Sequence, residues 1–471
     1  MQLPFKNRLL ILTLMISLSS CVISRDVPVP HNTMPATFRG TPITMDKSIA
    51  TLPHRDFIKE EAVIQLIDSA VLKNYDMQIA LKNIEAASVV LRQSRLGNLP
   101  SANLSITASS SRPSDNSLNG LTVSQFADTR HIEDYNASVG LSWEADIWRK
   151  IANQKNLAGA TYLQSEEAKK AVQTRLVSTI ATGFYNLVML DAQLEIARKN
   201  LRLNDTTLNM IRLQFKSGQV TSLAIQQAEA QRQLAAGLVP ALEQQIAIQE
   251  NALSILTGVF PGVIERQVAL NSLKTERSFA TGIPSDMLSH RPDVKAAELE
   301  LHRSNALVGI SRANMYPSLT ISATGGVNAF KASNWFAIPG SLFGVVGGGI
   351  TQPIFQRKQL KTQYELASID REKSVLQFRS TVLHAVAEVS DELIRIEKLE
   401  EQYSISDTRV KVVKEGLRNA NLLFKSGMAN YLEVVTAQAN ALQSELDLTS
   451  IRTAQLIANV ELYRTLGGGW R

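Results

Sequence analysis

The sequence predicts a mixed α/β membrane protein in which a few membrane-crossing β-strands are joined to very long α-helices. Three observations lead to this class. An export signal opens the chain, four later segments alternate apolar and polar residues as strands do, and two long Pro-free stretches have helical periodicity. After the signal, no segment has 18 consecutive apolar residues, so any part that crosses lipid must consist of strands.

The composition is that of a folded protein. Of 471 residues, 44% are hydrophobic and 20% are charged, and the formal net charge is +6. No long basic run occurs, so we expect no nucleic-acid partner. One Cys and six scattered His cannot form an internal disulfide or a metal cluster with the usual spacing, so we expect no metal site.

Residues 1–20 have the features of a lipoprotein signal peptide. Lys6 and Arg8 form a basic head, and Leu9–Leu18 is a mostly apolar stretch too short for a mature spanning helix. Leu18-Ser19-Ser20-Cys21 resembles the bacterial lipoprotein cleavage box, in which the Cys becomes the first mature residue and carries the lipid. A buried Cys in an ordinary signal peptide is the alternative, but the only Cys lies where the box requires it.

We therefore expect a covalent lipid, including palmitate, on Cys21 and no other cofactor. Because one acyl chain holds a protein only marginally, several chains or a second membrane contact are needed. Val22, rather than Asp, follows the Cys, which by analogy with lipoprotein sorting favours passage to the outer membrane. We predict that residues 21–56 form an extended tether, because this segment contains Pro28, Pro30, Pro35, Pro42 and Pro53.

The rest of the chain is two copies of one plan. At an offset of 209, Leu213–Gly218 matches Leu422–Gly427, and at an offset of 217, Asp76 and Pro100 match Asp293 and Pro317. The first repeat covers residues 57–258, a linker covers 259–284, and the second repeat covers 285–471. Each repeat is predicted to run in the order helix, two strands, long helix, Lys-Ser-Gly turn and return helix.

Four segments have the period of strands: 99–112, 136–148, 317–330 and 341–355. The second is the clearest, and the fourth is Gly-rich and less regular. Eleven residues at about 3.3 Å each reach roughly 36 Å, enough for a tilted crossing of a bilayer core about 30 Å thick. A half-buried sheet of a soluble protein is the alternative, because alternation alone is a weak signal.

The predicted long helices cover 149–216 and 358–425, and the return helices cover 220–257 and 429–466. Roughly 65 residues at 1.5 Å each make a rod of about 100 Å, which must pack against its return helix and other neighbours. Gly218 and Gly427 can take the left-handed conformation that ends a helix. Lys216 and Lys425 mark the turns, although a Lys there can simply complement the helix dipole.

Four strands cannot close a barrel, because spanning barrels begin at about eight strands. Open strand edges are not tolerated in hydrocarbon, since each unpaired main-chain group costs several kcal/mol there. If the strands cross a membrane, the chain must therefore assemble with copies of itself. We expect three copies to form a 12-stranded trimeric β-barrel that is wide enough for a channel. The long helices of the three copies would continue it as an α-helical coiled-coil barrel.

The sequence resembles the TolC-like outer membrane factor family across nearly the whole mature chain. Within that family it resembles the lipoprotein branch (NodT-like), which serves multidrug efflux systems of the resistance-nodulation-division type. The residues that carry the resemblance are the box at Cys21, both Gly-centred turns, Trp143–Trp148, His290–Val294 with Ala297 and Glu298, Ala313–Ser318 and Gln352–Phe355.

The resemblance implies a homotrimer that is a passive exit duct for drugs or other small molecules and confers multidrug resistance. It would be lipid-anchored in the outer membrane, in contact with its lipid, and its helical tunnel would cross the periplasm. Its partners would be a periplasmic adaptor protein and an inner-membrane pump of the resistance-nodulation-division type.

The resemblance also assigns roles to residues. The adaptor-docking tips would be Phe215, Lys216, Ser217, Gly218, Phe424, Lys425, Ser426 and Gly427. The pore would be lined by Glu144, Asp146, Arg418 and Asn421. The residues Arg291, Pro292, Asp293 and Glu298 would form a structural motif, with the first three starting a helix.

We do not expect an enzyme, because the chain has no GxxxxGK[ST], HExxH or GxSxG motif and so no candidate catalytic residue. The main alternative is a structural coiled-coil outer membrane lipoprotein without a pore. Such a spacer needs no strands with a polar face, so the four alternating segments argue against it. Within the family, an exit duct for type I secretion or metal efflux is a further alternative.

Overall fold

A computed structural model of the chain describes residues 26–30, 35, 37–39, 48–119, 130–274, 281 and 284–471. The described chain forms two compact units, and several long helices contribute to both. Unit 1 contains Glu85–Leu163, Glu298–Leu376 and the described residues up to Pro30. Unit 2 contains Gln164–Ala297, Gln377–Arg471 and the described residues between 31 and 84.

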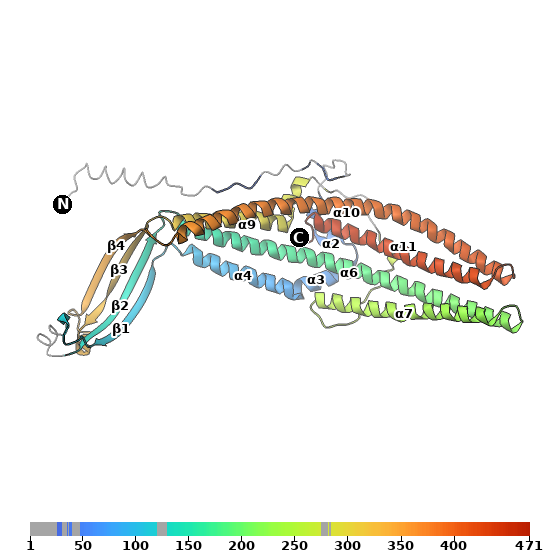
Figure 1. The fold of residues 1–471 in the computed structure, drawn as a ribbon, viewed down its shortest axis with the longest axis horizontal. Coiled ribbons are helices and arrows are strands. Elements are labelled where there is room, and N and C mark those ends of the chain that lie inside the picture. The colour runs from blue at the N-terminus through green and yellow to red at the C-terminus, as the bar shows by residue number, and fades with distance from the viewer. Residues whose placement is uncertain are drawn as a thin grey trace. The chain divides into compact units, whose positions relative to one another are not determined.

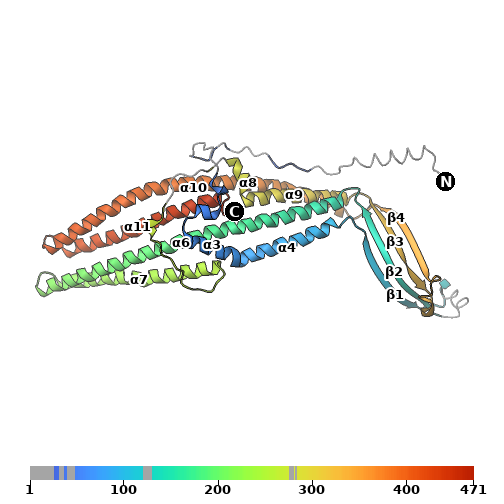
Figure 2. The same ribbon diagram turned by 180° about the vertical axis from the view of Figure 1, so that it is seen from behind.

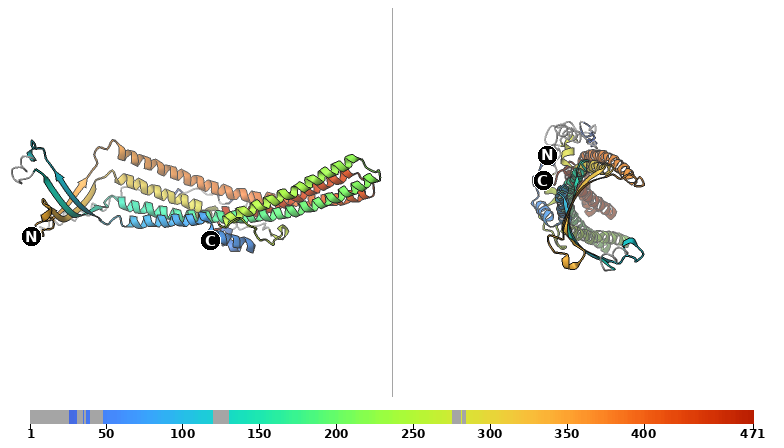
Figure 3. Two further views of the ribbon diagram at one scale, coloured as in Figure 1. Left: turned by 90° about the horizontal axis from the view of Figure 1, so that it is seen from below. Right: turned by 90° about the vertical axis from the view of Figure 1, so that its left-hand side faces the viewer.

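Unit 1 is built on one antiparallel four-stranded sheet. The strands are β1 (Ser101–Ser111), β2 (Ile132–Ala145), β3 (Ser318–Ala329) and β4 (Leu342–Thr351), and they pair in chain order. Figures 1 and 3 show the strands side by side in a curved sheet. Because β2 pairs with β3, the sheet joins the two sequence repeats.

Three strand boundaries differ by three or four residues from those that the alternation predicts, and one of them is the end of β2 at Ala145 rather than at 148. β2 begins at Ile132 rather than at 136, because the far end of β1 extends to Ser111 and pairs with it. β4 ends at Thr351 rather than at 355. Pro353 follows this end, and a proline has no N–H to donate to a ladder.

Most of the longer helices of unit 2 either extend into unit 1 or pair with another helix as a hairpin. The bounds of the longer helices are α3 (Glu61–Lys73), α4 (Tyr75–Arg95), α6 (Lys150–Lys216), α7 (Ser222–Leu256), α9 (Pro292–Ala313), α10 (Gln359–Lys425) and α11 (Tyr431–Thr465). Shorter helical segments are η1 (Ile49–Thr51), α2 (His54–Phe57), η2 (Leu270–Ser272), η3 (Pro284–Asp286), α8 (Met287–His290) and η4 (Ala332–Asn334). No helix among the described residues is both long and apolar enough to cross a membrane.

In unit 2, α6 runs beside α7 and α10 runs beside α11, each pair joined by a tight turn (Figure 2). The main apolar core gathers side chains of α3, α6, α7 and α11, with Phe184 and Ile67 fully buried. A second cluster near the turns joins the two hairpins through Ile211, Phe424 and Val434. Packing of these long helices against one another supplies the burial that a lone rod lacks.

Candidate functional site

The strand register divides the sheet into two faces, because directly opposed residues of neighbouring strands point to the same side. On one face the residues are apolar or small: Ala102, Leu104, Ile106, Tyr135, Ala137, Val139, Leu141, Trp143, Leu319, Ile321, Ala323, Val327, Leu342, Val346 and Ile350. On β1, β2 and β3 the other face is polar: Ser101, Asn103, Ser105, Thr107, Asn136, Ser138, Ser142, Glu144, Ser318, Thr320, Ser322, Thr324 and Asn328. The Gly-rich β4 is less regular and places Phe343 and Val345 on this second face.

The apolar face is open to the surroundings of the single chain. Leu104, Ile106 and Ile350 are among its exposed side chains. A monomeric soluble protein rarely exposes a continuous apolar patch of this kind, whereas hydrocarbon on one side and water on the other suit both faces. The sheet therefore has the chemistry of a wall between lipid and water.

The two edge strands of the sheet, β1 and β4, each lack a strand partner on one side within the described residues. Within the described residues, β1 pairs only with β2 and β4 pairs only with β3. The outer edges of β1 and β4 thus offer main-chain N–H and C=O groups without strand partners. Inside a bilayer such groups must be paired, since no water is available to replace the missing bonds.

Glu144 and Asp146, predicted to line the pore, lie where β2 gives way to α6. Glu144 is on the polar face, opposite Thr320, and forms an ion pair with Lys150 at 3.0 Å. Asp146 lies beyond the strand and accepts hydrogen bonds from the N–H groups of Ile151 at 2.9 Å and Ala152 at 2.8 Å. Both of its oxygens therefore satisfy N–H groups in the first turn of α6, although Asp146 lies four residues before Lys150.

The two hairpin turns share one geometry. Gly218 and Gly427 have φ angles of 77° and 76°, in the left-handed region that glycine adopts most readily. In each turn the residue after Gly donates its N–H to a carbonyl five residues back: Gln219 to Gln214 and Met428 to Leu423, both at 2.9 Å. This pattern is a Schellman cap, and it exposes Lys216 and Lys425 together with the following Ser.

The eight predicted docking residues differ in exposure, and their role in docking stays a prediction. Phe215 is 44% exposed, but the equivalent Phe424 is 3% exposed and packs in the cluster with Ile211 and Val434. The side chain of Phe424 therefore supports the turn from inside. Sequence repetition made the two Phe look equivalent, whereas packing between the two hairpins distinguishes them.

Arg418 and Asn421, the other predicted pore-lining residues, lie on α10 just before its turn. Arg418 is exposed and forms an ion pair with Glu415 at 2.7 Å, so part of its charge is neutralised locally. Asn421 is half-buried and donates to the carbonyl of Leu417 at 2.9 Å. Nearby, the Tyr431 hydroxyl bonds to the side chain of Gln227 and links α11 to α7, a contact that sequence reasoning missed.

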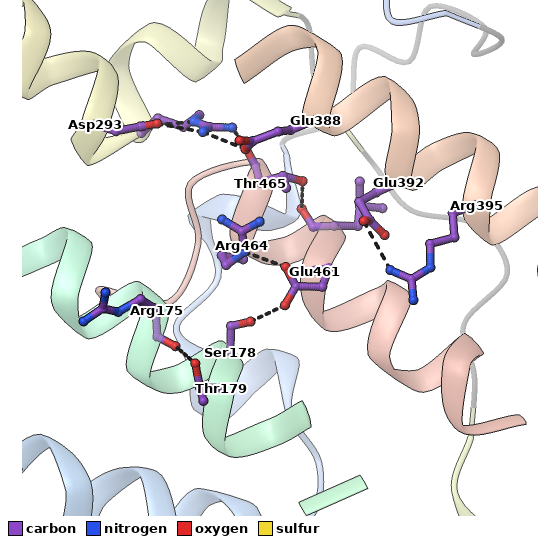
Figure 4. A network of polar contacts seen from close by, with 12 residues as sticks. Arg175, Ser178, Thr179, Asp293, Glu388, Glu392, Arg395, Glu461, Arg464 and Thr465 are labelled. Carbon is purple, nitrogen blue, oxygen red and sulfur yellow. Dashed lines mark hydrogen bonds and ion pairs between the residues drawn. The ribbon is translucent and has the colours of Figure 1, made fainter. Parts of the chain in front are cut away.

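The Arg-Pro-Asp motif starts α9 and ties it to two other helices (Figure 4). The Arg291 side chain is 6% exposed and binds the carboxylates of Asp293 at 2.7 Å and Glu388 on α10 at 2.9 Å. A further guanidinium N–H donates to the carbonyl of Thr465, the last residue of α11, at 2.9 Å. One cation thus fastens three helices, while Glu298 lies five residues after Asp293 on α9 and is half-buried.

Two carboxyl groups of unit 2, those of Asp293 and Glu392, have pKa values shifted in opposite directions. Burial opposes ionisation of Asp293, but its hydrogen bonds and charge pairing with Arg291 prevail and lower its pKa. Burial raises the pKa of Glu392 on α10, and the nearby Glu461 adds to this effect although Arg395 opposes it. Oε2 of Glu392 is buried and has no hydrogen-bond partner in the described chain.

The remaining predicted residue, Cys21, lies outside the described residues. The described part of the chain contains no group of three or more His, Cys, Asp or Glu side chains that could hold a metal ion. The hollow beside Glu144 and Asp146 measures about 120 Å³. Small-molecule sites usually measure roughly 300–1,000 Å³, so this hollow is too small for a drug-sized ligand.

Comparison with known proteins agrees with this geometry. A sequence profile of the family described as "Outer membrane efflux protein" matches residues 66–259 and 283–468, one segment in each repeat. The toluene efflux pump outer membrane protein TtgC of Pseudomonas putida is 27% identical over 460 residues, covering 96% of this chain and 93% of its own. The cation efflux system protein CusC of Escherichia coli is 24% identical over 459 residues, covering 97% of both chains.

Solved structures share the fold. A crystal structure from a study of CusC folding and transmembrane channel formation matches with a TM-score of 0.84 at 25% identity, covering 95% of this chain and 100% of its own. The open state of the Neisseria gonorrhoeae MtrE outer membrane channel matches with a TM-score of 0.84 at 22% identity, covering 96% and 99%. The two-repeat plan of strands and long helices, predicted from the sequence, is confirmed.

Proposed function

We infer how this protein works from the premise that the chain belongs to the outer membrane efflux protein family, whose profile covers both repeats. It is an exit duct of an efflux system in the outer membrane, with a helical tunnel in the periplasm. The observation that carries this function is the four-stranded sheet with one apolar face and one mostly polar face. Such a sheet can separate lipid from a water-filled passage.

The working unit that we propose is a homotrimer. Each copy supplies four strands, and the open edge of β4 would pair with β1 of the next copy until 12 strands close a barrel. Closure satisfies the edge groups, which otherwise cost several kcal/mol each in hydrocarbon. The hairpins α6–α7 and α10–α11 of three copies would pack as a coiled-coil barrel that continues the passage.

The proposed partners are a periplasmic adaptor protein and an inner-membrane pump of the resistance-nodulation-division type. The exposed turns around Lys216 and Lys425 support docking of the adaptor at the ends of the hairpins. Charged, rigid turns of this kind suit recognition of a complementary protein surface. The chain itself would be a passive conduit without catalytic activity, so the energy for transport must come from the pump.

The cargo that we propose is a drug or another small molecule, which makes the protein a component of multidrug resistance. Relatives are named for the efflux of toluene and of cations, so related ducts serve chemically different cargo. This variety suits a duct that selects by size rather than by a built binding site. Metal efflux and type I secretion are the alternatives that cargo assays would reveal.

Anchoring through a palmitate-bearing lipid on Cys21 is part of the proposal. Val27, six residues further along, is bound to Asn305 on α9, so the lipid would insert close to unit 1. A Cys21→Ser variant should lose labelled palmitate and still assemble. Palmitate that still enters this variant would refute the lipid site.

Single-channel conductance tests the duct directly. Purified protein in planar lipid bilayers should give discrete conductance steps together with an oligomer that migrates differently after heating. Deletion of the gene, alone and with neighbouring inner-membrane pump genes, should raise drug susceptibility by the same amount in each strain. A helical protein without conductance steps would instead favour a structural lipoprotein spacer.

A further inference from the structure

The segment between β3 and β4, residues 330–341, displays large apolar side chains, and we call it the aromatic loop. Phe336 is 69% exposed, Ile338 is 66% exposed and Phe330 is 42% exposed. Lys331 is exposed beside them. Apolar side chains gathered on one short loop are costly to hydrate, so this patch calls for an apolar partner.

The aromatic loop is held in place by its own hydrogen bonds. The buried Ser341 donates from its hydroxyl to the carbonyl of Asn334 at 2.6 Å and from its N–H to the carbonyl of Ala337 at 3.1 Å. Its carbonyl accepts from the N–H of Asn328 at 2.8 Å. The exposed side chains are therefore presented on a fixed backbone, which lowers the entropy lost on binding.

The loop is continuous with the apolar face of the sheet. The ring of Trp335 lies 5.4 Å from that of Tyr135 and 5.1 Å from that of Phe336, measured between centroids. Tyr135 belongs to the apolar face, in the same series as Val139 and Leu141. The patch thus extends the face that the proposed function assigns to lipid.

Aromatic residues also lie at the other end of the sheet. Trp143 lies on the apolar face, and its indole N–H donates to the carbonyl of Asn98 at 2.8 Å. Beyond the strand ends, the rings of Trp148 and Tyr316 lie tilted against each other, with centroids 4.9 Å apart, and line the hollow beside Glu144. From Tyr135 to Trp143 a strand advances about 26 Å, which a tilt of about 40° reduces to a height of roughly 20 Å, so both residues fit within the apolar band of about 25 Å.

We propose that the aromatic loop is a membrane anchor that inserts Phe336 and Ile338 into the headgroup–acyl boundary of the outer leaflet. This inference rests on the proposed function, which places on the periplasmic side the strand ends that connect to the long helices. The aromatic loop, at the opposite ends of the strands, then lies at the outer surface. Trp and Tyr rings favour the interface between lipid and water, and the Lys331 ammonium suits the phosphate groups of lipid. The loop would complement the lipid on Cys21 as a second membrane contact.

Site-directed fluorescence in liposomes tests this anchor. Replacement of Cys21 by Ser removes the only native Cys, after which Phe336→Cys and Ile338→Cys each carry one environment-sensitive nitrobenzoxadiazole group. In vesicles of phospholipid brominated on its acyl chains, both labels should shift to the blue and lose most of their fluorescence. The matched control, Ser333→Cys on the same loop, should keep its fluorescence.

Two results would overturn the anchor. Labels at 336 and 338 that are quenched no more than the label at 333 would show that the loop does not reach lipid. Efficient oxidative cross-linking between protomers at 336 would show that a neighbouring copy covers the patch. Gel migration of unheated and heated samples shows whether each variant still forms an oligomer. If the oligomer forms, the fluorescence results test the anchor alone. If no oligomer forms, both the proposed function and the anchor are contradicted.

Discussion

The side-chain amide of Asn305 holds the main chain of Val27 at both of its hydrogen-bonding groups. Oδ1 accepts from the Val27 N–H at 3.2 Å, and Nδ2 donates to the Val27 carbonyl at 3.0 Å. Asn305 is 5% exposed, so a buried side chain on α9 binds a segment 278 residues away. Six residues span at most about 21 Å, which limits the distance between Cys21 and this point.

Asn305→Ala should release the tether. Both hydrogen bonds are lost, each with a net value of about 1 kcal/mol, and nothing else in the side chain replaces them. Hydrogen exchange at the amide of Val27 should accelerate while exchange within α9 stays unchanged. Asn305→Asp keeps the acceptor and should give intermediate exchange; equal rates in the native protein and the Ala variant would contradict the role of Asn305.

Arg291→Lys should destabilise unit 2 although it keeps the charge. An ammonium cannot serve the two carboxylates and the Thr465 carbonyl together, as the planar guanidinium does. We expect a loss of about 1–3 kcal/mol, because Asp293 and Glu388 are 46% and 43% exposed and can be rehydrated. Urea unfolding followed by circular dichroism measures this loss, and a Lys variant as stable as the native protein would refute it.

Asp293 and Glu392 should have opposite effects on the pH dependence of stability. The pKa of Asp293 is lowered on folding, so its contribution is present above its ordinary pKa of 3.8 and is lost as pH falls through the folded value. The pKa of Glu392 is raised, so its contribution is present below its ordinary 4.5 and is lost as pH rises through the folded value.

At neutral pH, Asp293→Asn should therefore lower the melting temperature and Glu392→Gln should raise it. The gain from Glu392→Gln should disappear below about pH 4, where the native carboxyl is itself protonated. Glu397→Gln, at an exposed position of the same helix, is the control and should change little. A Glu392→Gln variant that is less stable at pH 7 would show that its charge is needed for pairing with Arg395.

Variants at Phe215 and Phe424 should distinguish an effect on docking from an effect on folding, although the two residues occupy equivalent places in the repeat. Phe424→Ala empties a buried site and should cost about 3–5 kcal/mol of stability. Phe215→Ala, on an exposed side chain, should leave stability nearly unchanged and weaken adaptor binding. Thermal melts with adaptor titrations measure both effects; similar melting of the two variants would contradict the assignment.

Charge reversal at Lys216 and Lys425 should weaken cross-linking to the adaptor without lowering the yield of trimer. Both ammonium groups lie on exposed turns whose backbones are fixed by Gly218 and Gly427, so the fold does not need them. The measurement is site-specific cross-linking in cells, with gel analysis of unheated samples for the trimer. Loss of the trimer would show instead that the turns serve assembly.

Periodicity and turn chemistry made the strands, the long helices and both hairpin turns predictable. The alternation along β2 and the Gly residues of the turns are local signals, and local signals predict local structure. Asp146 gave no such signal, because it lies four residues before Lys150 and not at the N-cap position of α6. Its place in the lining of the pore stays a prediction.

Contacts between distant segments could not be predicted in this way. Asn305 has no local feature that points to Val27, and the Arg-Pro-Asp motif does not indicate Glu388 or Thr465 as partners. The burial of Phe424 depends on how the two hairpins pack, which equivalent sequences do not reveal. Such pairings are decided by the tertiary arrangement of the chain.

The mass of the native assembly shows whether copies of the chain share one wall, because the described residues of one chain supply four strands with two open edges. Native mass spectrometry of protein extracted from outer membranes in mild detergent counts the copies. We expect three copies that stay together until the sample is heated. A folded single copy that conducts ions would contradict the account, because a wall closed by shared strands would then be unnecessary.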